Sequence, residues 1–205
     1  MIRRIFSIFF ILFLLFITSY AEQLRVCWVK DGDTIILTNG KIVRYLGINA
    51  PELGSIKWPE EPYAREALAY NIKLVKGKVV YLETDIEKYD RYGRLLAYVF
   101  LKDGTFVNLE MVKAGYAHVL FLKPNLKYRK ELLAAQRAAM KKRKNIWQVL
   151  LKETCTYYLG NKRSFKFHRP NCELGKMISR KNRIIFKNKW DAFYQGYSPC
   201  RWCMP

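Results

Sequence analysis

The segment that decides the fold runs from Val29 to Glu52 and reads VKDGDTIILTNGKIVRYLGINAPE. Its apolar residues follow a period of two over 34–37 and 41–46, which is typical of half-buried β-strands. The dipeptide Asn39-Gly40 lies between these stretches and suits a tight turn. The segment therefore predicts a β-hairpin.

Further strands and helices are predicted on both sides of this hairpin. Apolar residues with a period of two recur in three other stretches: 24–29, 79–83 and 95–100. Helical spacing predicts three helices: 63–75, 107–114 and 126–144. Five short strands with one inserted helix and two later helices indicate an α+β fold, a five-stranded Greek-key barrel of the oligonucleotide-binding type (OB-fold). This fold favours nucleic acid as a partner, though only by association.

Composition describes a globular and strongly basic chain. The 205 residues are 51% hydrophobic and 15% aromatic, which is enough for one good core and a small extra module. Lys and Arg number 37 against 17 Asp and Glu, for a formal net charge of +20. Such an excess favours a polyanionic partner. Nucleic acid fits this requirement, and anionic lipid or cell-wall polymer is the alternative that charge alone leaves open.

The first 21 residues predict an export signal. Arg3 and Arg4 precede an apolar run over 5–17, and Ser19 and Ala21 are small residues at the positions that a signal peptidase reads. We expect cleavage after Ala21 and a secreted or periplasmic protein. An uncleaved membrane anchor is the alternative, although the run is shorter than the ~20 residues that cross a bilayer.

Two acidic residues at the start of the hairpin are candidates for metal binding. Asp31 and Asp33 flank Gly32, so in an extended segment both carboxylates face one side and repel each other unless a cation holds them. Carboxylate oxygens suit a hard ion such as Ca²⁺ or Mg²⁺. The alternative is an Asx turn, in which Asp31 caps the bend and Asp33 is solvated. For an isolated D-G-D-T that alternative is the better interpretation.

The surrounding sequence changes this assessment. Three further motifs follow Asp33 in order: Arg44, GINAPE at 47–52 and DRYGR at 90–94. Together, Asp33, Arg44, Glu52 and Arg94 resemble the staphylococcal nuclease (thermonuclease) family. The resemblance covers roughly 24–147 and includes two other blocks: FVNLEMVKAGYA at 106–117 and KNIW at 144–147.

The resemblance implies a role for each matched residue. Asp33 corresponds to a calcium-binding aspartate and Asp31 to the acid that helps to shape the metal shell. Arg44 and Arg94 correspond to two arginines that grip the scissile phosphate, and such planar groups stabilise charge that grows in the transition state. Glu52 corresponds to a glutamate that positions or deprotonates the attacking water. Calcium would polarise the phosphoryl group.

The chain departs from the family pattern at two places. Asn49 stands where the family usually has a second metal-binding aspartate, so it offers a carbonyl oxygen without a charge. Leu120 and Leu122 stand where the staphylococcal enzyme has two tyrosines that pack against the nucleotide. Base stacking then falls to Tyr92, and we expect the neighbouring Arg91 to bind substrate as well.

The composition changes after Trp147, and we place a boundary near Leu151. The tail contains four of the five cysteines. One imidazole and three thiolates have the layout of a tetrahedral zinc site: His168, Cys172, Cys200 and Cys203. The tail resembles the small zinc-binding domain of Ada DNA-repair proteins, whose first ligand is a cysteine where this chain has His168.

Disulfide bonding is the alternative for the tail, because an exported protein meets an oxidising compartment. Cys27 and Cys155 fall outside the zinc pattern, and we expect them to be buried thiols or one disulfide. Within the loop between the two ligand pairs, Asn188 is placed to cap a helix that Gly196 ends.

These observations predict three parts: a signal peptide (1–21), a thermonuclease-like OB-fold domain (22–150) and an Ada-like zinc-binding module (151–205). The resemblance implies a calcium-dependent nuclease that cleaves DNA and/or RNA to leave 3′-phosphate and 5′-hydroxyl ends. From the N-terminal segment we expect export, from the tail a structural zinc ion, and for the whole protein a monomer. The alternatives are a non-catalytic nucleic-acid-binding protein with a nuclease-like fold and, less well supported, a basic structural protein of the cell envelope.

Overall fold

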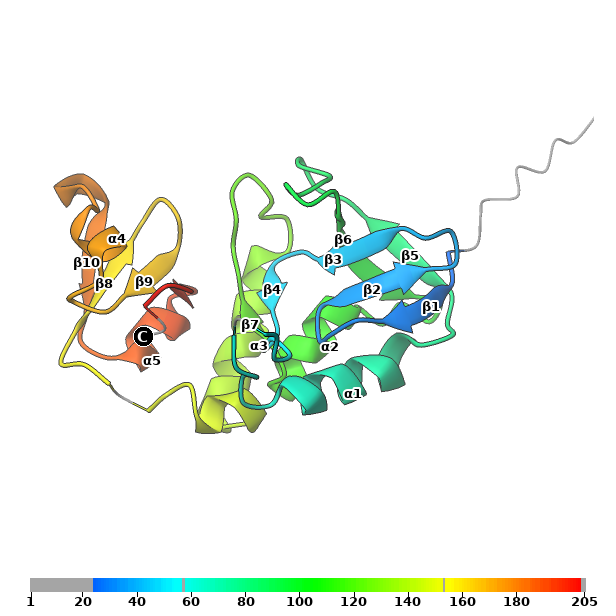
Figure 1. Ribbon diagram of the computed structural model, residues 1–205, viewed down its shortest axis with the longest axis horizontal. Helices are drawn as coiled ribbons and strands as arrows, with labels where there is room; N and C mark the ends of the chain where they lie inside the picture. The colour runs from blue at the N-terminus through cyan, green and yellow to red at the C-terminus, as the bar shows by residue number, and fades with distance from the viewer. Residues whose placement is uncertain (1–23, 57, 153, 204–205) are drawn as a thin grey trace, which may run out of the picture.

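The computed structural model describes residues 24–56, 58–152 and 154–203 (Figure 1). The predicted signal peptide and its alternative, a membrane anchor, lie outside these ranges. Within the described ranges, no helix has both the length and the hydropathy to cross a bilayer.

The five predicted strands are confirmed, and they form one mixed sheet in the order β1-β2-β3-β6-β5. Their bounds are as follows: β1 Val26–Val29, β2 Thr34–Leu37, β3 Ile42–Tyr45, β5 Val80–Glu83 and β6 Leu95–Leu101. Within this sheet, only β3 and β6 pair in parallel. Two short strands pair separately: β4 (Ile48–Asn49) and β7 (His118–Val119).

The expected barrel is not closed by a continuous ladder. Edge strands β1 and β5 meet at one end, where a single bridge joins Arg25 to Val79 and the Val26 N–H donates to the Lys78 carbonyl at 3.0 Å. A shift of register between Val26 and Trp28 interrupts β1, and β5 begins only at Val80. The overlap of the edges is therefore too short for full closure.

The β2–β3 hairpin forms as predicted and sets the geometry of the acidic segment. Gly40 has a φ of 78°, which the turn requires and which glycine adopts without strain. The register pairs Thr34 with Arg44, and the Tyr45 N–H donates to the Asp33 carbonyl at 2.8 Å. This pairing brings Asp33 and Arg44 to the same end of the hairpin.

The three predicted helices are present: α1 Ala64–Val75, α2 Val107–Ala114 and α3 Arg129–Lys141. The third is shorter than predicted, because residues 126–128 form a turn in which the Arg129 N–H donates to the Leu126 carbonyl at 3.1 Å. A 3-10 turn, η1 (Asn145–Gln148), follows it.

The tail forms a second sheet in the order β10-β8-β9-β11. Its elements are β8 Tyr158–Asn161, β9 Lys166–His168, α4 Glu173–Lys176, η2 Arg180–Asn182, β10 Arg183–Phe186, α5 Lys189–Tyr194 and β11 Ser198–Pro199. Asn188 caps α5 as predicted, since its side chain accepts the Asp191 N–H at 2.7 Å. Gly196 follows the helix with a φ of 84°.

The tail packs against α3, which lies between the two sheets in Figure 1. The ring of Phe193 contacts Trp147 at a centroid distance of 5.1 Å and His118 at 5.7 Å. Gln136 in α3 donates to the Phe193 carbonyl at 2.6 Å. Buried residues of both regions belong to one hydrophobic cluster, and the division of the chain near Leu151 remains a prediction.

All five cysteines are free thiols. The prediction of a buried thiol is wrong for Cys27, which is exposed, and Cys155 is only partly buried. The register shift in β1 explains the error, because it leaves Cys27 and Trp28 both facing solvent between buried Val26 and Val29.

Candidate active site

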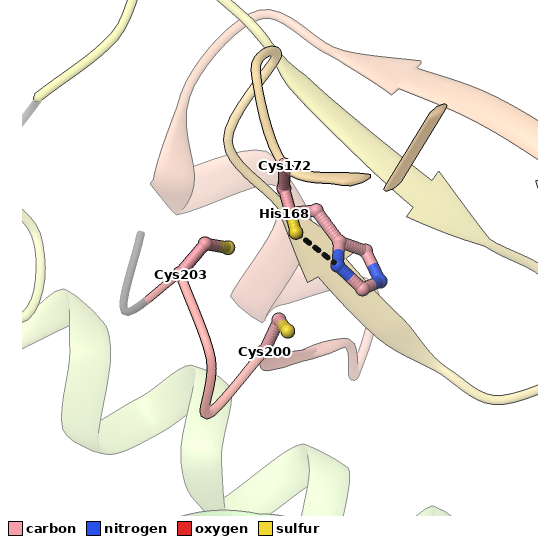
Figure 2. A group of neighbouring side chains, drawn as sticks. All are labelled: His168, Cys172, Cys200 and Cys203. Carbon is pink, nitrogen blue, oxygen red and sulfur yellow. Dashed lines mark hydrogen bonds between the residues drawn. The ribbon is translucent and has the colours of Figure 1, made fainter. Parts of the chain in front are cut away.

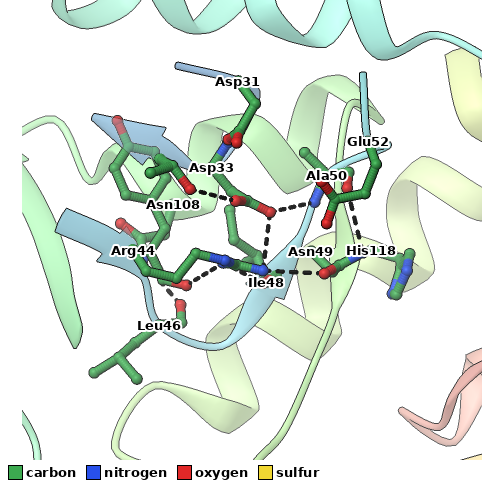
Figure 3. A network of polar contacts seen from close by, with 12 residues as sticks. Asp31, Asp33, Arg44, Leu46, Ile48, Asn49, Ala50, Glu52, Asn108 and His118 are labelled. Carbon is green, nitrogen blue, oxygen red and sulfur yellow. Dashed lines mark hydrogen bonds and ion pairs between the residues drawn. The ribbon is translucent and has the colours of Figure 1, made fainter. Parts of the chain in front are cut away.

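Asp33 is the centre of a buried polar network (Figure 3). Its side chain accepts hydrogen bonds from the Ala50 N–H at 2.7 Å and from the Thr34 hydroxyl at 3.1 Å, and it forms an ion pair with Arg44 at 3.0 Å. Burial nevertheless raises its pKa to about 7 against the opposing effect of Arg44, and repulsion from Asp31 and Glu52 raises it further. A bound cation would relieve this cost, so the site fits a divalent metal.

Asp31 forms the Asx turn that the sequence left open. Its Oδ1 accepts the Asp33 N–H at 2.9 Å. The turn packs tightly, since a Cβ on Gly32 would lie 2.5 Å from the Cβ of Ala50, so only glycine fits there. Asp33 is buried and not solvated. The turn and the acidic pair therefore coexist, and the turn orients Asp33.

Arg44 is buried and its guanidinium already donates within the protein. Nη1 donates to the carbonyls of Tyr45 at 2.7 Å and Ile48 at 2.9 Å. Nη2 donates to Asn49 Oδ1 at 3.0 Å. The candidate ligand oxygen of Asn49 therefore points toward Arg44 (Figure 3), and a metal ion would have to share it with the guanidinium.

Arg94 lines a cavity of about 440 Å³ together with Arg44, Arg91 and Tyr92. Asp90 orients it, since Arg94 Nε donates to Asp90 Oδ2 at 2.7 Å. Burial opposes ionisation of Asp90, but hydrogen bonds from Arg94 and from the Tyr92 N–H bring its pKa below the usual value. Asp90 was not predicted as a site residue, although its place four residues before Arg94 in DRYGR is a signal for such a pair.

Tyr92 offers an exposed aromatic face beside this cavity. Its side chain is 67% exposed, and the guanidinium carbons of Arg91 and Arg94 lie 4.8 and 5.6 Å from the ring centroid. The structure therefore brings together the predicted substrate-binding pair and one of the predicted arginines.

Glu52 lines a second cavity, of about 380 Å³, with Asn49 and His118. The Glu52 N–H donates to Glu61 Oε2 at 3.0 Å, and the Glu61 N–H donates to the Glu52 carbonyl at 3.0 Å. Glu61 is a second site residue that was not predicted, and its pKa is raised by burial and by the charge of Glu52. Leu120 lines both cavities, so they adjoin.

The tail contains a separate cluster with ligand atoms within 4.8 Å of one another (Figure 2): His168, Cys172, Cys200 and Cys203. Cys172 Sγ lies 3.4 Å from His168 Nδ1. Burial raises the pKa of Cys203 to about 12, and the neighbouring thiols add to this. Across residues 24–56, 58–152 and 154–203, it is the only set of three or more His, Cys, Asp or Glu placed closely enough to hold a metal.

The comparisons with known proteins agree with this geometry. A family profile described as "Staphylococcal nuclease homologue" matches residues 42–149. The chain is 40% identical over 129 residues to a thermonuclease of Staphylococcus hyicus, covering 62% of this chain and 76% of that protein. It is 42% identical over 130 residues to a thermonuclease of Staphylococcus intermedius, covering 62% and 77%.

A third relative is Endonuclease YncB of Bacillus subtilis, 38% identical over 122 residues and covering 57% of each chain. The matched range 42–149 contains Arg44, Glu52 and Arg94, the residues that surround the two adjoining cavities. On these grounds the chain belongs to the staphylococcal nuclease family and is a nuclease that hydrolyses phosphodiester bonds of nucleic acid.

Proposed function

We propose that this protein is an exported, calcium-dependent nuclease that cleaves DNA and/or RNA at the 5′ P–O bond and leaves 3′-phosphate and 5′-hydroxyl ends. One observation carries the proposal: the buried Asp33–Arg44 pair connects the two cavities, because Arg44 lines the cavity of Arg94 and donates to Asn49, which lines the cavity of Glu52. A phosphodiester at this junction would have cationic and acidic groups on opposite sides.

Asp33 would hold the metal, with Asn49 and Asp31 as further oxygen donors. Bound there, Ca²⁺ would withdraw charge from the phosphoryl oxygens and favour attack on phosphorus. The buried carboxyl of Asp33 supports this assignment, because burial raises its pKa despite Arg44, and a cation bound there would favour its charged form. The two-residue β4 strand, which pairs with β7, positions Asn49 beside it.

The two arginines have different roles. Asp90 accepts a hydrogen bond from the Nε–H of Arg94. The Nη groups are therefore the donors that Arg94 offers to a phosphate. Both Nη groups of Arg44 donate to protein oxygens, so Arg44 contributes mainly its charge and the orientation of Asp33. The paired carboxylate keeps Arg94 in place as charge grows on the phosphoryl oxygens.

Glu52 is the general base. Its side chain is exposed at a water-accessible cavity, and two backbone hydrogen bonds with Glu61 fix the segment that carries it. A carboxylate at such a cavity can take a proton from a water that attacks phosphorus.

The tail is the structural part of the proposal. Four ligand atoms within 4.8 Å of one another fit one tetrahedral Zn²⁺ with one nitrogen and three sulfur ligands. Gly175 lets α4 approach this site, since a Cβ there would lie 2.9 Å from the Cβ of His168. The proposal also includes export of the protein and the division of the exported chain into a nuclease domain (22–150) and a zinc-binding module (151–205).

The test is cleavage of end-labelled single-stranded DNA and RNA by the chain without residues 1–21, after transfer into metal-free buffer and titration with Ca²⁺. Elemental analysis of the same sample reports zinc, so that the two metals are distinguished. We expect calcium-dependent cleavage and 3′-phosphate products. Cleavage without calcium, or 5′-phosphate products, would contradict the metal or the end chemistry respectively.

A further inference from the structure

The cavity that contains Glu52 is built by both regions of the protein. The nuclease region supplies Asn49, Glu52 and Glu61, and the tail supplies Lys166, Pro199 and Arg201. Its volume of about 380 Å³ is in the range of sites for small ligands and single nucleotides. The tail is therefore a wall of the candidate active site.

The tail side of this cavity is cationic. Lys166 is half-buried in β9, and its ammonium donates to the Pro199 carbonyl at 3.4 Å. Its positive charge acts on both Arg44 and His118, so it lies near the catalytic network. The hydrogen bond holds Lys166 at the wall of the cavity, and its charge acts on the arginine that pairs with Asp33.

Arg201 occupies a different position on the same wall. It is exposed, and its guanidinium lies 5.8 Å from the ring centroid of Trp58, an exposed residue of the nuclease region. Its charge also reaches Glu61. Arg201 and Lys166 therefore present two cations to the cavity that Glu52 also lines.

The two adjoining cavities define a path for a nucleic-acid strand. Arg91, Tyr92 and Arg94 line one cavity, Lys166 and Arg201 line the other, and Leu120 lines both. A strand whose scissile phosphate lies at the junction would extend into each cavity, and its neighbouring phosphates would need cations on both sides.

We propose that Lys166 and Arg201 bind substrate phosphates on the Glu52 side of the scissile bond, so that the tail completes the substrate groove. This inference rests on the proposed function, because it takes Glu52 and Arg94 as the centre of the reaction. It assigns the tail a direct part in substrate binding, in addition to any structural role of its metal.

The first test measures binding without hydrolysis. Fluorescence anisotropy of a labelled single-stranded 12-nucleotide DNA, in calcium-free buffer, compares the variant Lys166→Gln/Arg201→Gln with Lys162→Gln/Arg163→Gln. The second pair removes the same charges from the β8–β9 turn, outside the cavity lining. We expect about tenfold weaker binding for the first pair, as for removal of charged hydrogen bonds, and less than about twofold for the control.

Salt dependence sharpens this test. For a single strand, the slope of log K against log salt falls by about 0.7 for each phosphate that a protein cation no longer neutralises. We expect that reduction for each cavity cation and an unchanged slope for the turn variant. Equal effects of both pairs would show general electrostatic attraction and overturn the proposal. A drop in thermal stability without weaker binding would show a structural anchor and would also overturn it.

Kinetics separate this inference from the proposed function. For the cavity variant, KM for the oligonucleotide should rise about tenfold over the wild-type value, in line with the weaker binding. The rate on bis(p-nitrophenyl) phosphate, which has no neighbouring phosphates, should fall less than kcat/KM for the oligonucleotide. If the wild type hydrolysed neither substrate, the proposed function would fail while the binding comparison still decided this inference.

Folding of the variants is checked by zinc content and thermal unfolding. Arg201 is exposed, so Arg201→Gln alone provides a second variant if the double variant does not fold. Lys166→Arg and Arg201→Lys keep the charge and should retain most of the affinity. Binding by these charge-conserving variants as weak as that of the Gln variants would overturn the assignment to phosphate.

Discussion

The candidate metal ligands of the nuclease region and those of the tail differ in how completely the protein assembles them. In the tail, four ligand atoms already lie within 4.8 Å of one another. In the nuclease region, Asp33 is paired with Arg44, Asp31 is engaged in a turn and the oxygen of Asn49 accepts from Arg44. The tail site is closed by protein atoms, whereas the other site is only partly formed.

This difference follows from the chemistry of the two ions. Zn²⁺ takes four ligands in a structural site, which the chain can supply alone. Ca²⁺ takes six to eight oxygens, so a site with few protein donors leaves positions for water and a phosphate. By this comparison, the proposed Zn²⁺ would stabilise the fold of the tail, and the proposed Ca²⁺ would take part in the reaction.

The largest expected effect would come from breaking the closed site. Cys200→Ser should remove the zinc, about one per chain in the wild type by elemental analysis, and lower the melting temperature by roughly 10 °C, the equivalent of several kcal/mol for a chain of this size. Cys27→Ser is the control, since that thiol is exposed. A wild type without zinc, or equal melting temperatures, would contradict a structural metal in the tail.

Breaking the partly formed site should abolish activity and spare the fold. Glu52→Gln and Arg94→Ala should each lower kcat at least ~100-fold, the usual cost of one preorganised transition-state contact. Melting temperature and zinc content should stay near wild type, because both side chains lie at a cavity. Glu60→Gln, at an exposed ion pair with Arg65, is the control. Wild-type rates in both variants would exclude the proposed mechanism.

The sequence predicted much of the fold, and it predicted candidate site residues that the structure brings near one another, because both rest on local patterns. The β2–β3 hairpin, the cap at Asn188 and the motif around Arg94 each lie within a few consecutive residues. Closure of the barrel could not be predicted, since it depends on how far β1 overlaps β5 across the sheet.

Partners that act over longer distances were also missed. Glu61 lies nine positions after Glu52 and is hydrogen-bonded to it, and the solvent exposure of Cys27 follows from the register shift in β1. The approach of Lys166 to the Glu52 cavity depends on docking of the tail, which no local pattern of residues encodes.

The stability of the protein should fall in acid because His118 is buried where the two regions meet. Burial lowers the pKa of His118 from 6.5 to about 4, and the charges of Lys166 and Arg44 contribute. The unfolded chain binds this proton below about pH 6.5 and the folded chain only near pH 4, so the free energy of unfolding falls as pH drops across that window. At ~1.4 kcal/mol per pH unit, the decrease is about 3 kcal/mol.

Urea unfolding between pH 7 and pH 4.5 would measure this decrease. In His118→Asn, the side-chain amide can donate to the Val119 carbonyl as Nδ1 does at 2.9 Å, without titrating. The stability of the variant should therefore fall less steeply with acid than that of the wild type. Parallel curves would mean that His118 does not titrate differently in the folded and unfolded chains.

The smallest expected effect would sharpen the nuclease site without breaking it. Asn49→Asp adds a charge next to Asp33, so the calcium concentration for half-maximal activity should fall a few-fold. The gain is limited because Arg44 already donates to this position. Asn39→Asp adds the same charge in the exposed hairpin turn and is the control. An unchanged or poorer calcium response would show that residue 49 does not contact the metal.

Gln136 determines how this chain can be divided. Its fully buried side chain accepts the Val119 N–H at 2.7 Å and donates to the Phe193 carbonyl at 2.6 Å. A chain cut after residue 151 would leave that amide group without its carbonyl and would expose the rings that Phe193 covers, including Trp147. Calorimetry of the full chain should then show a single cooperative transition, and the smallest autonomous folding unit would be larger than the matched range 42–149.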